Sequence, residues 1–139
     1  MAQADILYVE DNEDYIDFMK RVMKKMESPV TMTTMTDSKA ALSTVKNTDN
    51  SPRYKLIILD IHMPGLDGIE VLQKIREQKE LIYTPVIMLS TSDNPKDAEN
   101  CYRSGANGYV VKPVGLQSLT SAMKYICDFW LNCNYPHQN

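Results

Sequence analysis

Residues 56–65 have the sequence Leu-Ile-Ile-Leu-Asp-Ile-His-Met-Pro-Gly, and this stretch decides the fold class of the chain. A short apolar run that is followed at once by turn residues is typical of a strand buried on both faces of a sheet. Asp60 ends the run, and ligands of open parallel sheets bind outside the carboxyl ends of strands. Asp60 is therefore a candidate functional carboxylate, although an Asp before Pro and Gly is also a common turn former.

Apolar runs and helical periodicity alternate along the whole chain. Strands are predicted at residues 5–10, 30–36, 54–60, 84–90 and 108–111, with the second nearer an edge. Helices are predicted at residues 15–26, 38–46, 69–75, 95–105 and 116–133, and a polar loop at 47–53. Five strands alternating with five helices predict an α/β fold with a doubly wound parallel sheet.

Length and composition limit the classes of function. The chain has 139 residues with 43% apolar residues and a net charge of −3, which predicts one domain and argues against nucleic-acid binding. We find no signal peptide and no apolar run of the ~18 residues that a membrane span needs. Three cysteines without CxxC spacing are typical of reduced thiols, so we expect a cytoplasmic protein with no membrane partner.

Four predicted strands end in polar residues that could act together. Glu10 and Asp11 follow the first strand, Asp60 the third, Ser90 the fourth and Lys112 the fifth. Each alone has an ordinary explanation as a cap, a loop residue or a solvated lysine. Because parallel strands bring all these ends to one edge of the sheet, their joint occurrence indicates a site.

These residue types suit phosphoryl transfer to a carboxylate. Clustered acids repel one another and favour a hard divalent cation with oxygen ligands, most simply Mg²⁺. A carboxylate can act as the nucleophile and form an aspartyl phosphate, while a lysine and a hydroxyl hold the remaining phosphoryl oxygens. Zinc is poorly supported, because His62 is the only histidine near the cluster and no cysteine lies there.

From about residue 5 to residue 131 the chain resembles the receiver domain of two-component response regulators, and in particular the single-domain chemotaxis type. The resemblance implies a flavodoxin-like sheet with strand order 2-1-3-4-5. It also implies the following roles: an acidic pair at Glu10 and Asp11, a phosphoacceptor at Asp60, a switch hydroxyl at Ser90, a switch aromatic at Tyr109 and the family lysine at Lys112. The bond between Lys112 and Pro113 is often cis in this family.

The resemblance further implies that Mg²⁺ is bound by Asp11, Asp60 and the backbone carbonyl of His62. Glu10 stands where an Asp is commoner, and its longer side chain favours contact with the metal through water in an outer shell.

Other departures from the family pattern lie around the expected phosphate. Ser90 replaces the commoner Thr, and Thr91 stands where a small residue is usual, which would narrow access to the site. His62 and Ser92 flank the path of a hydrolytic water, and we expect His62 to block that water rather than to orient it.

Three functions compete at this stage. The first is a receiver of residues 1–139, without a separate output domain, that takes phosphate from a sensor histidine kinase or phosphotransfer protein and signals to a downstream protein target. Such a protein is a switch and not an enzyme. The second is a Mg²⁺-dependent phosphohydrolase of the haloacid dehalogenase type, which needs an acid two residues after its nucleophile, where this chain has His62. The third is an unphosphorylated interaction module, favoured only if Asp60 or Lys112 were missing.

The last predicted helix carries more apolar residues than one core stripe needs. The apolar residues that lie on one face of this helix, and so form its core stripe, are Leu119, Ala122, Met123, Ile126 and Trp130. Tyr125, Phe129 and Leu131 lie outside it and either pack under neighbouring segments or extend a partner surface. We expect a homodimer through the face made by the fourth helix, the fifth strand and the fifth helix.

Overall fold

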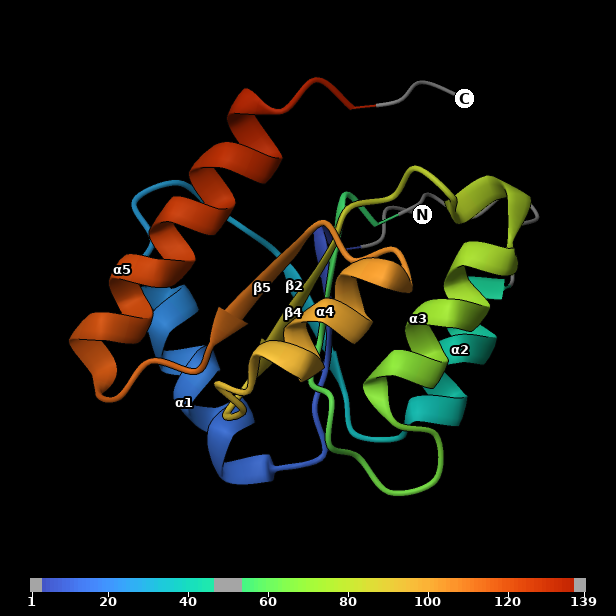
Figure 1. Ribbon diagram of the computed structural model, residues 1–139. Helices are drawn as coiled ribbons and strands as arrows, with labels where there is room; N and C mark the ends of the chain where they lie inside the picture. Colours follow the sequence, from blue (N-terminus) through green and yellow to red (C-terminus); the bar gives the residue numbers. More distant parts are fainter. Residues whose placement is uncertain (1–3, 47–53, 137–139) are drawn as a thin grey trace.

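The computed structural model describes residues 4–46 and 54–136, so the predicted loop at 47–53 lies outside the described part. A five-stranded parallel sheet with the order β2-β1-β3-β4-β5 forms its centre (Figure 1). The strands are β1 (Ile6–Val9), β2 (Met32–Met35), β3 (Leu56–Leu59), β4 (Val86–Ser90) and β5 (Gly108–Val111). The helices are α1 (Glu13–Lys24), α2 (Ser38–Lys46), α3 (Gly68–Glu77), α4 (Pro95–Arg103) and α5 (Leu116–Cys127). The predicted fold class and strand order are both confirmed.

The helices cover the sheet on both faces. Helices α1 and α5 pack together on one side, and α2, α3 and α4 follow one another on the other side (Figure 1). Side chains alternate along β3, so Leu56 and Ile58 enter the core under α1 and α5, whereas Ile57 and Leu59 enter the opposite core. All four are fully buried, which confirms the prediction of a strand that is covered on both faces.

Short-range capping sets where the helices begin. The Asn12 side chain accepts the Tyr15 amide at the start of α1, and the Asn94 side chain does the same for Lys96 before α4. At the start of α3, Asp67 and Glu70 form a reciprocal capping box. These caps supply acceptors for backbone amides of the first helical turn, which have no partner within the helix.

The end of the last helix departs from the prediction of one helix to residue 133. The α-helical hydrogen bonds stop at Cys127, and a π-helical segment, η2 (Asp128–Cys133), continues the chain. The wider π turn reduces the angle between consecutive residues. Trp130 and Leu131 can therefore both pack against the core, although α-helical spacing placed Leu131 well away from the core stripe.

Three further features complete the fold. A 3₁₀ turn, η1 (Lys79–Leu81), which the sequence did not indicate, links α3 to β4. The bond between Lys112 and Pro113 is trans, in contrast to the cis form common in the resembling family, since the described residues contain no cis peptide bond. Within residues 4–46 and 54–136, none of the helices has the length and apolar character needed to cross a bilayer.

Candidate functional site

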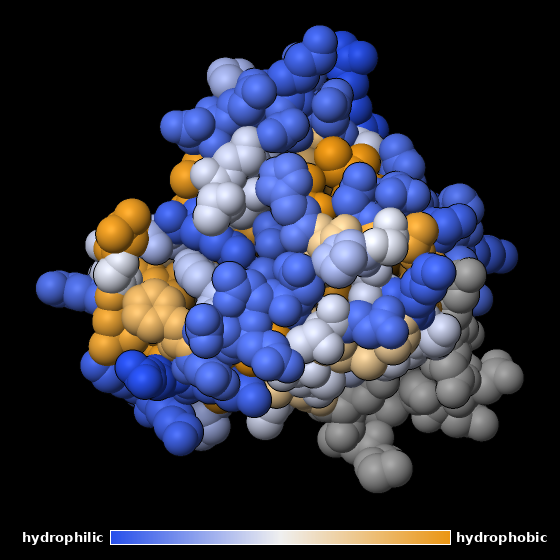
Figure 2. Space-filling view, turned by 90° about the horizontal axis from the view of Figure 1, so that it is seen from below, coloured by the Kyte–Doolittle hydropathy of each residue, from blue (hydrophilic) through white to orange (hydrophobic). Residues whose placement is uncertain are grey.

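Backbone pairing brings the predicted polar residues to one edge of the sheet. The Asp60 amide donates to the Val9 carbonyl at 3.1 Å, which sets Asp60 beside Glu10 at the ends of β3 and β1. The Lys112 amide donates to the Ser90 carbonyl at 2.7 Å, which joins the ends of β5 and β4. Figure 2 views the molecule from this end and shows a largely hydrophilic face with apolar side chains gathered toward its margins.

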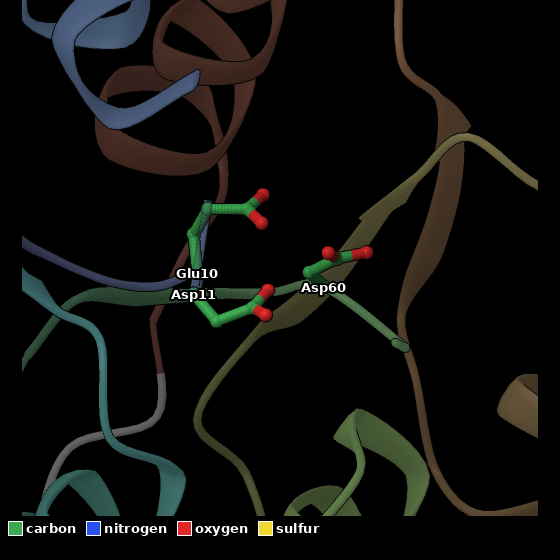
Figure 3. Close-up of side chains that lie close together, drawn as sticks. All are labelled: Glu10, Asp11 and Asp60. Atoms are coloured by element: carbon green, nitrogen blue, oxygen red, sulfur yellow. The ribbon is translucent and has the colours of Figure 1, made fainter. Parts of the chain in front are cut away.

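Three carboxylates converge at the centre of this edge. Glu10, Asp11 and Asp60 each have an oxygen within 4.8 Å of the others (Figure 3). Glu10 and Asp60 are buried, whereas Asp11 remains accessible to solvent. Hard oxygen donors in this number and spacing fit a divalent cation such as Mg²⁺ or Mn²⁺.

Lys112 lies among these carboxylates and binds two of them. Its ammonium nitrogen is 2.6 Å from Glu10 Oε1 and 3.4 Å from Asp60 Oδ2, and its side chain is only 7% exposed. Burial raises the pKa of Glu10, the Lys112 hydrogen bond opposes this, and the nearby Asp60 raises the pKa further. When ionised, the three carboxylates and one ammonium leave two net negative charges, which a divalent cation would balance.

Glu10 is also held by two donors that the sequence did not indicate. The Tyr8 hydroxyl donates to Oε1 at 2.9 Å, and the Asn12 amide donates to Oε2 at 3.3 Å. Burial above all, and then the charge of Glu10, raise the pKa of Tyr8, so Tyr8 keeps its proton. The sequence contained one signal for this contact. Tyr8 stands two residues before Glu10, and residues i and i+2 of an extended segment lie on the same face.

The segment after β4 is tied to β5. Ser90 is buried, and its Oγ accepts the Ser92 amide at 3.3 Å. The hydroxyl of half-buried Tyr109 donates to the Ser92 carbonyl at 2.8 Å. Tyr109 therefore already lies inward in this structure, whereas Thr91 and His62 are exposed beside the site.

A flavodoxin-like sheet with an acidic trio, a lysine and a hydroxyl at its carboxyl edge defines a receiver domain. The family model of the response regulator receiver domain matches residues 6–124, and the chain belongs to this family. The comparisons give no support to the phosphohydrolase alternative.

Two relatives extend over nearly the whole chain. The probable methanogenesis regulatory protein FilR2 of Methanothrix harundinacea is 30% identical over 131 residues, 93% of this chain and 84% of that protein. Response regulator Rcp1 of Synechocystis sp. is 33% identical over 129 residues, 91% of this chain and 88% of that protein.

Solved structures agree with these sequence relations. The phosphorylated cyanobacterial phytochrome response regulator RcpA is 31% identical, with a TM-score of 0.87 over 99% of this chain and 100% of that chain. The Mn²⁺-bound form of Rcp1 is 31% identical, with a TM-score of 0.84 over 98% of this chain and 100% of that chain.

Proposed function

We propose that this receiver domain accepts a phosphoryl group on Asp60 from a sensor histidine kinase or phosphotransfer protein. An Asp60 carboxylate oxygen forms a bond to phosphorus while the bond from phosphorus to the donor's histidine nitrogen breaks, and that nitrogen takes up a proton. One observation carries this proposal: Lys112 and three carboxylates meet at the carboxyl edge of the sheet. The protein would act as a switch and catalyse only its own phosphorylation and dephosphorylation, in the cytoplasm.

Mg²⁺ is the proposed cofactor of this site, where it would supply positive charge between the carboxylates and the incoming phosphoryl group. Asp11 and Asp60, with the backbone carbonyl of His62, are its proposed protein ligands. Glu10 would meet the cation through water, because its two oxygens already accept bonds from the side chain of Lys112, from Tyr8 and from a backbone amide. The Mn²⁺-bound form of Rcp1 supports a divalent cation in this family.

Ser90 and Tyr109 are the proposed switch residues. After phosphorylation the Ser90 hydroxyl would turn from the Ser92 amide and donate to a phosphoryl oxygen. The resemblance to receiver domains implies an inward position of Tyr109 in the phosphorylated state, and in this structure its hydroxyl already donates to the Ser92 carbonyl. Phosphorylation would therefore stabilise the inward position that Tyr109 already has.

Residues beside the phosphate would set its lifetime. His62, which is exposed two residues after Asp60, is proposed to block the hydrolytic water. Thr91, which is exposed directly after Ser90, is proposed to narrow access to the site. Replacement of His62 by Ala should then shorten the half-life of the phosphorylated protein. A longer half-life in that variant would indicate that His62 orients the hydrolytic water.

We also propose a partner surface on α4, β5 and α5, for a downstream target or a second copy of the chain. Its exposed apolar residues are Tyr102 on α4, Val111 on β5, Tyr125 on α5 and Phe129 just after α5. Leu131 packs against the core and contributes less than we had expected. Sedimentation with and without beryllofluoride tests for a dimer, and a monomer in both states would leave a different protein as the partner.

Labelling with acetyl phosphate and Mg²⁺ tests the phosphoacceptor. Wild-type protein should gain one acid-stable, base-labile phosphoryl group, and Asp60→Asn should gain none while keeping its fold. Asp11→Asn should lose most Mg²⁺ affinity, and Glu10→Gln should lose less. Label that persists in Asp60→Asn would refute the assignment of the phosphoacceptor.

A further inference from the structure

The ring of Tyr15 lies against the Lys112 ammonium, which Glu10 and Asp60 also contact. The Lys112 nitrogen lies 4.3 Å from the centre of the Tyr15 ring. Glu10 and Asp60 contact the same nitrogen, and the lysine side chain is almost wholly buried. An aromatic face attracts a cation most strongly when water is excluded, so the ring is well placed to hold this ammonium.

The Tyr15 ring is itself fixed by its neighbours. The Asn12 cap accepts the Tyr15 amide at 3.1 Å, which sets the start of α1. The ring of Phe18 meets the Tyr15 ring edge to face, with 5.8 Å between their centres. With its backbone held by the Asn12 cap and its ring packed against Phe18, Tyr15 can in turn restrain the lysine that lies over the ring.

The Tyr15 hydroxyl is a buried donor without a recipient. In the described part of the chain it is the only buried side-chain nitrogen or oxygen that lacks a hydrogen-bond partner. Buried polar groups in folded proteins nearly always have a hydrogen-bond partner. The exception at Tyr15 therefore indicates an acceptor that is present in another state of the site. Burial, followed by the charges of Glu10 and Asp60, raises the pKa of Tyr15 to about 12, so the hydroxyl keeps its proton near neutral pH.

We propose that Tyr15 is a positioning residue of this site: its ring holds the Lys112 ammonium beside Asp60, and its hydroxyl donates to an oxygen that the site gains when occupied. That oxygen belongs either to a water on the metal or to the phosphoryl group. The role of the ring rests on contacts in this structure alone, whereas the role of the hydroxyl rests on the proposed function. The sequence placed Tyr15 only at the start of the first predicted helix, residues 15–26.

Nuclear magnetic resonance of the unphosphorylated protein tests the ring. Protons on the Lys112 carbon next to the ammonium should be shifted upfield by the ring in wild type and in Tyr15→Phe. The shift should vanish in Tyr15→Leu and remain in the matched control Tyr135→Leu, which removes an exposed tyrosine beyond η2. Lys112 resonances that are the same in wild type and Tyr15→Leu would overturn the proposal.

The hydroxyl is tested by the ring-carbon resonance next to the Tyr15 oxygen, which Tyr15→Phe identifies by its loss. A shift of this resonance with Mg²⁺ alone assigns the acceptor to a metal-bound water. A shift that also requires beryllofluoride assigns it to the phosphoryl group. No change in either condition would overturn the role of the hydroxyl.

Phosphorylation kinetics separate positioning from folding. The maximal rate with acetyl phosphate should fall by about tenfold in Tyr15→Leu with little change in Mg²⁺ affinity, because a misplaced group slows the chemical step. Tyr15→Phe should recover most of that loss, and the control Tyr135→Leu should match wild type. If wild-type protein is not phosphorylated by acetyl phosphate, the proposed function is refuted. The role of the Tyr15 ring is then still tested by the Lys112 resonances of wild type and Tyr15→Leu.

Discussion

Replacement of Gly68 by Ala should damage both the stability of the protein and the site at Asp60. A Cβ at position 68 would lie 1.9 Å from the Asp60 carbonyl oxygen and 2.9 Å from the Ile61 Cα. These are backbone atoms and cannot swing aside. To regain ordinary contact, the start of α3 must move about 1.5 Å from the segment after β3.

The size of this effect follows from what the movement breaks. The Gly68 amide donates to the Ile61 carbonyl at 2.7 Å, and losing such a bond costs about 1 kcal/mol. Overpacking typically costs about 1–3 kcal/mol. We therefore expect Gly68→Ala to lower the free energy of unfolding by about 3 kcal/mol, and the melting temperature by about 10 °C.

Thermal unfolding followed by circular dichroism measures this loss, with Gly108→Ala as the matched control. A Cβ at position 108 would lie 2.9 Å from the Cδ1 of Ile87, the end of a flexible side chain that can rotate away. The control should lose about 1 kcal/mol or less. In Gly68→Ala, Mg²⁺ affinity should also fall, because the chain around Asp60 is displaced. A Gly68→Ala melting temperature within about 2 °C of wild type would refute the steric argument.

Four further predictions concern other parts of the molecule. The Arg76 guanidinium donates to several backbone carbonyls and so connects α3 to the segment before β4 and to the turn before β5. Arg76→Met should therefore lower the free energy of unfolding, measured by urea titration, by about 2–4 kcal/mol. Its Mg²⁺ affinity should not change. Tyr109→Phe should speed amide hydrogen exchange after β4, since a bond to that segment is lost. At pH 8 a thiol reagent should modify only Cys133 in the native protein, because burial raises the pKa of Cys101 and Cys127 to about 11 and the thiolate is the reactive form. Stability should also fall as the pH rises from about 8.5 toward 11, where these two thiols ionise first in the unfolded chain.

Local sequence patterns determined the secondary structure and the edge of the sheet at which the site lies. The apolar run before Asp60 predicted a strand buried on both faces, and the structure confirms it. The fourth helix was predicted to begin at residue 95, and the structure confirms this start at Pro95 with Asn94 as its cap. The carboxyl ends of parallel strands share one edge, so the order of elements alone brought Glu10, Asp60 and Lys112 into one neighbourhood.

The tertiary structure decided which of these neighbours touch. Only the distances in the folded structure assign the shorter ion pair of Lys112 to Glu10 rather than to Asp60. They also add Tyr8 and Tyr15 as partners of this group of side chains. The sequence could not supply this because a contact between side chains on different elements depends on packing to within an ångström, whereas periodicity fixes only the face of an element. The π turn after Cys127 has the same origin, since it accompanies the packing of Trp130 and Leu131 against the core and has no local sequence signal.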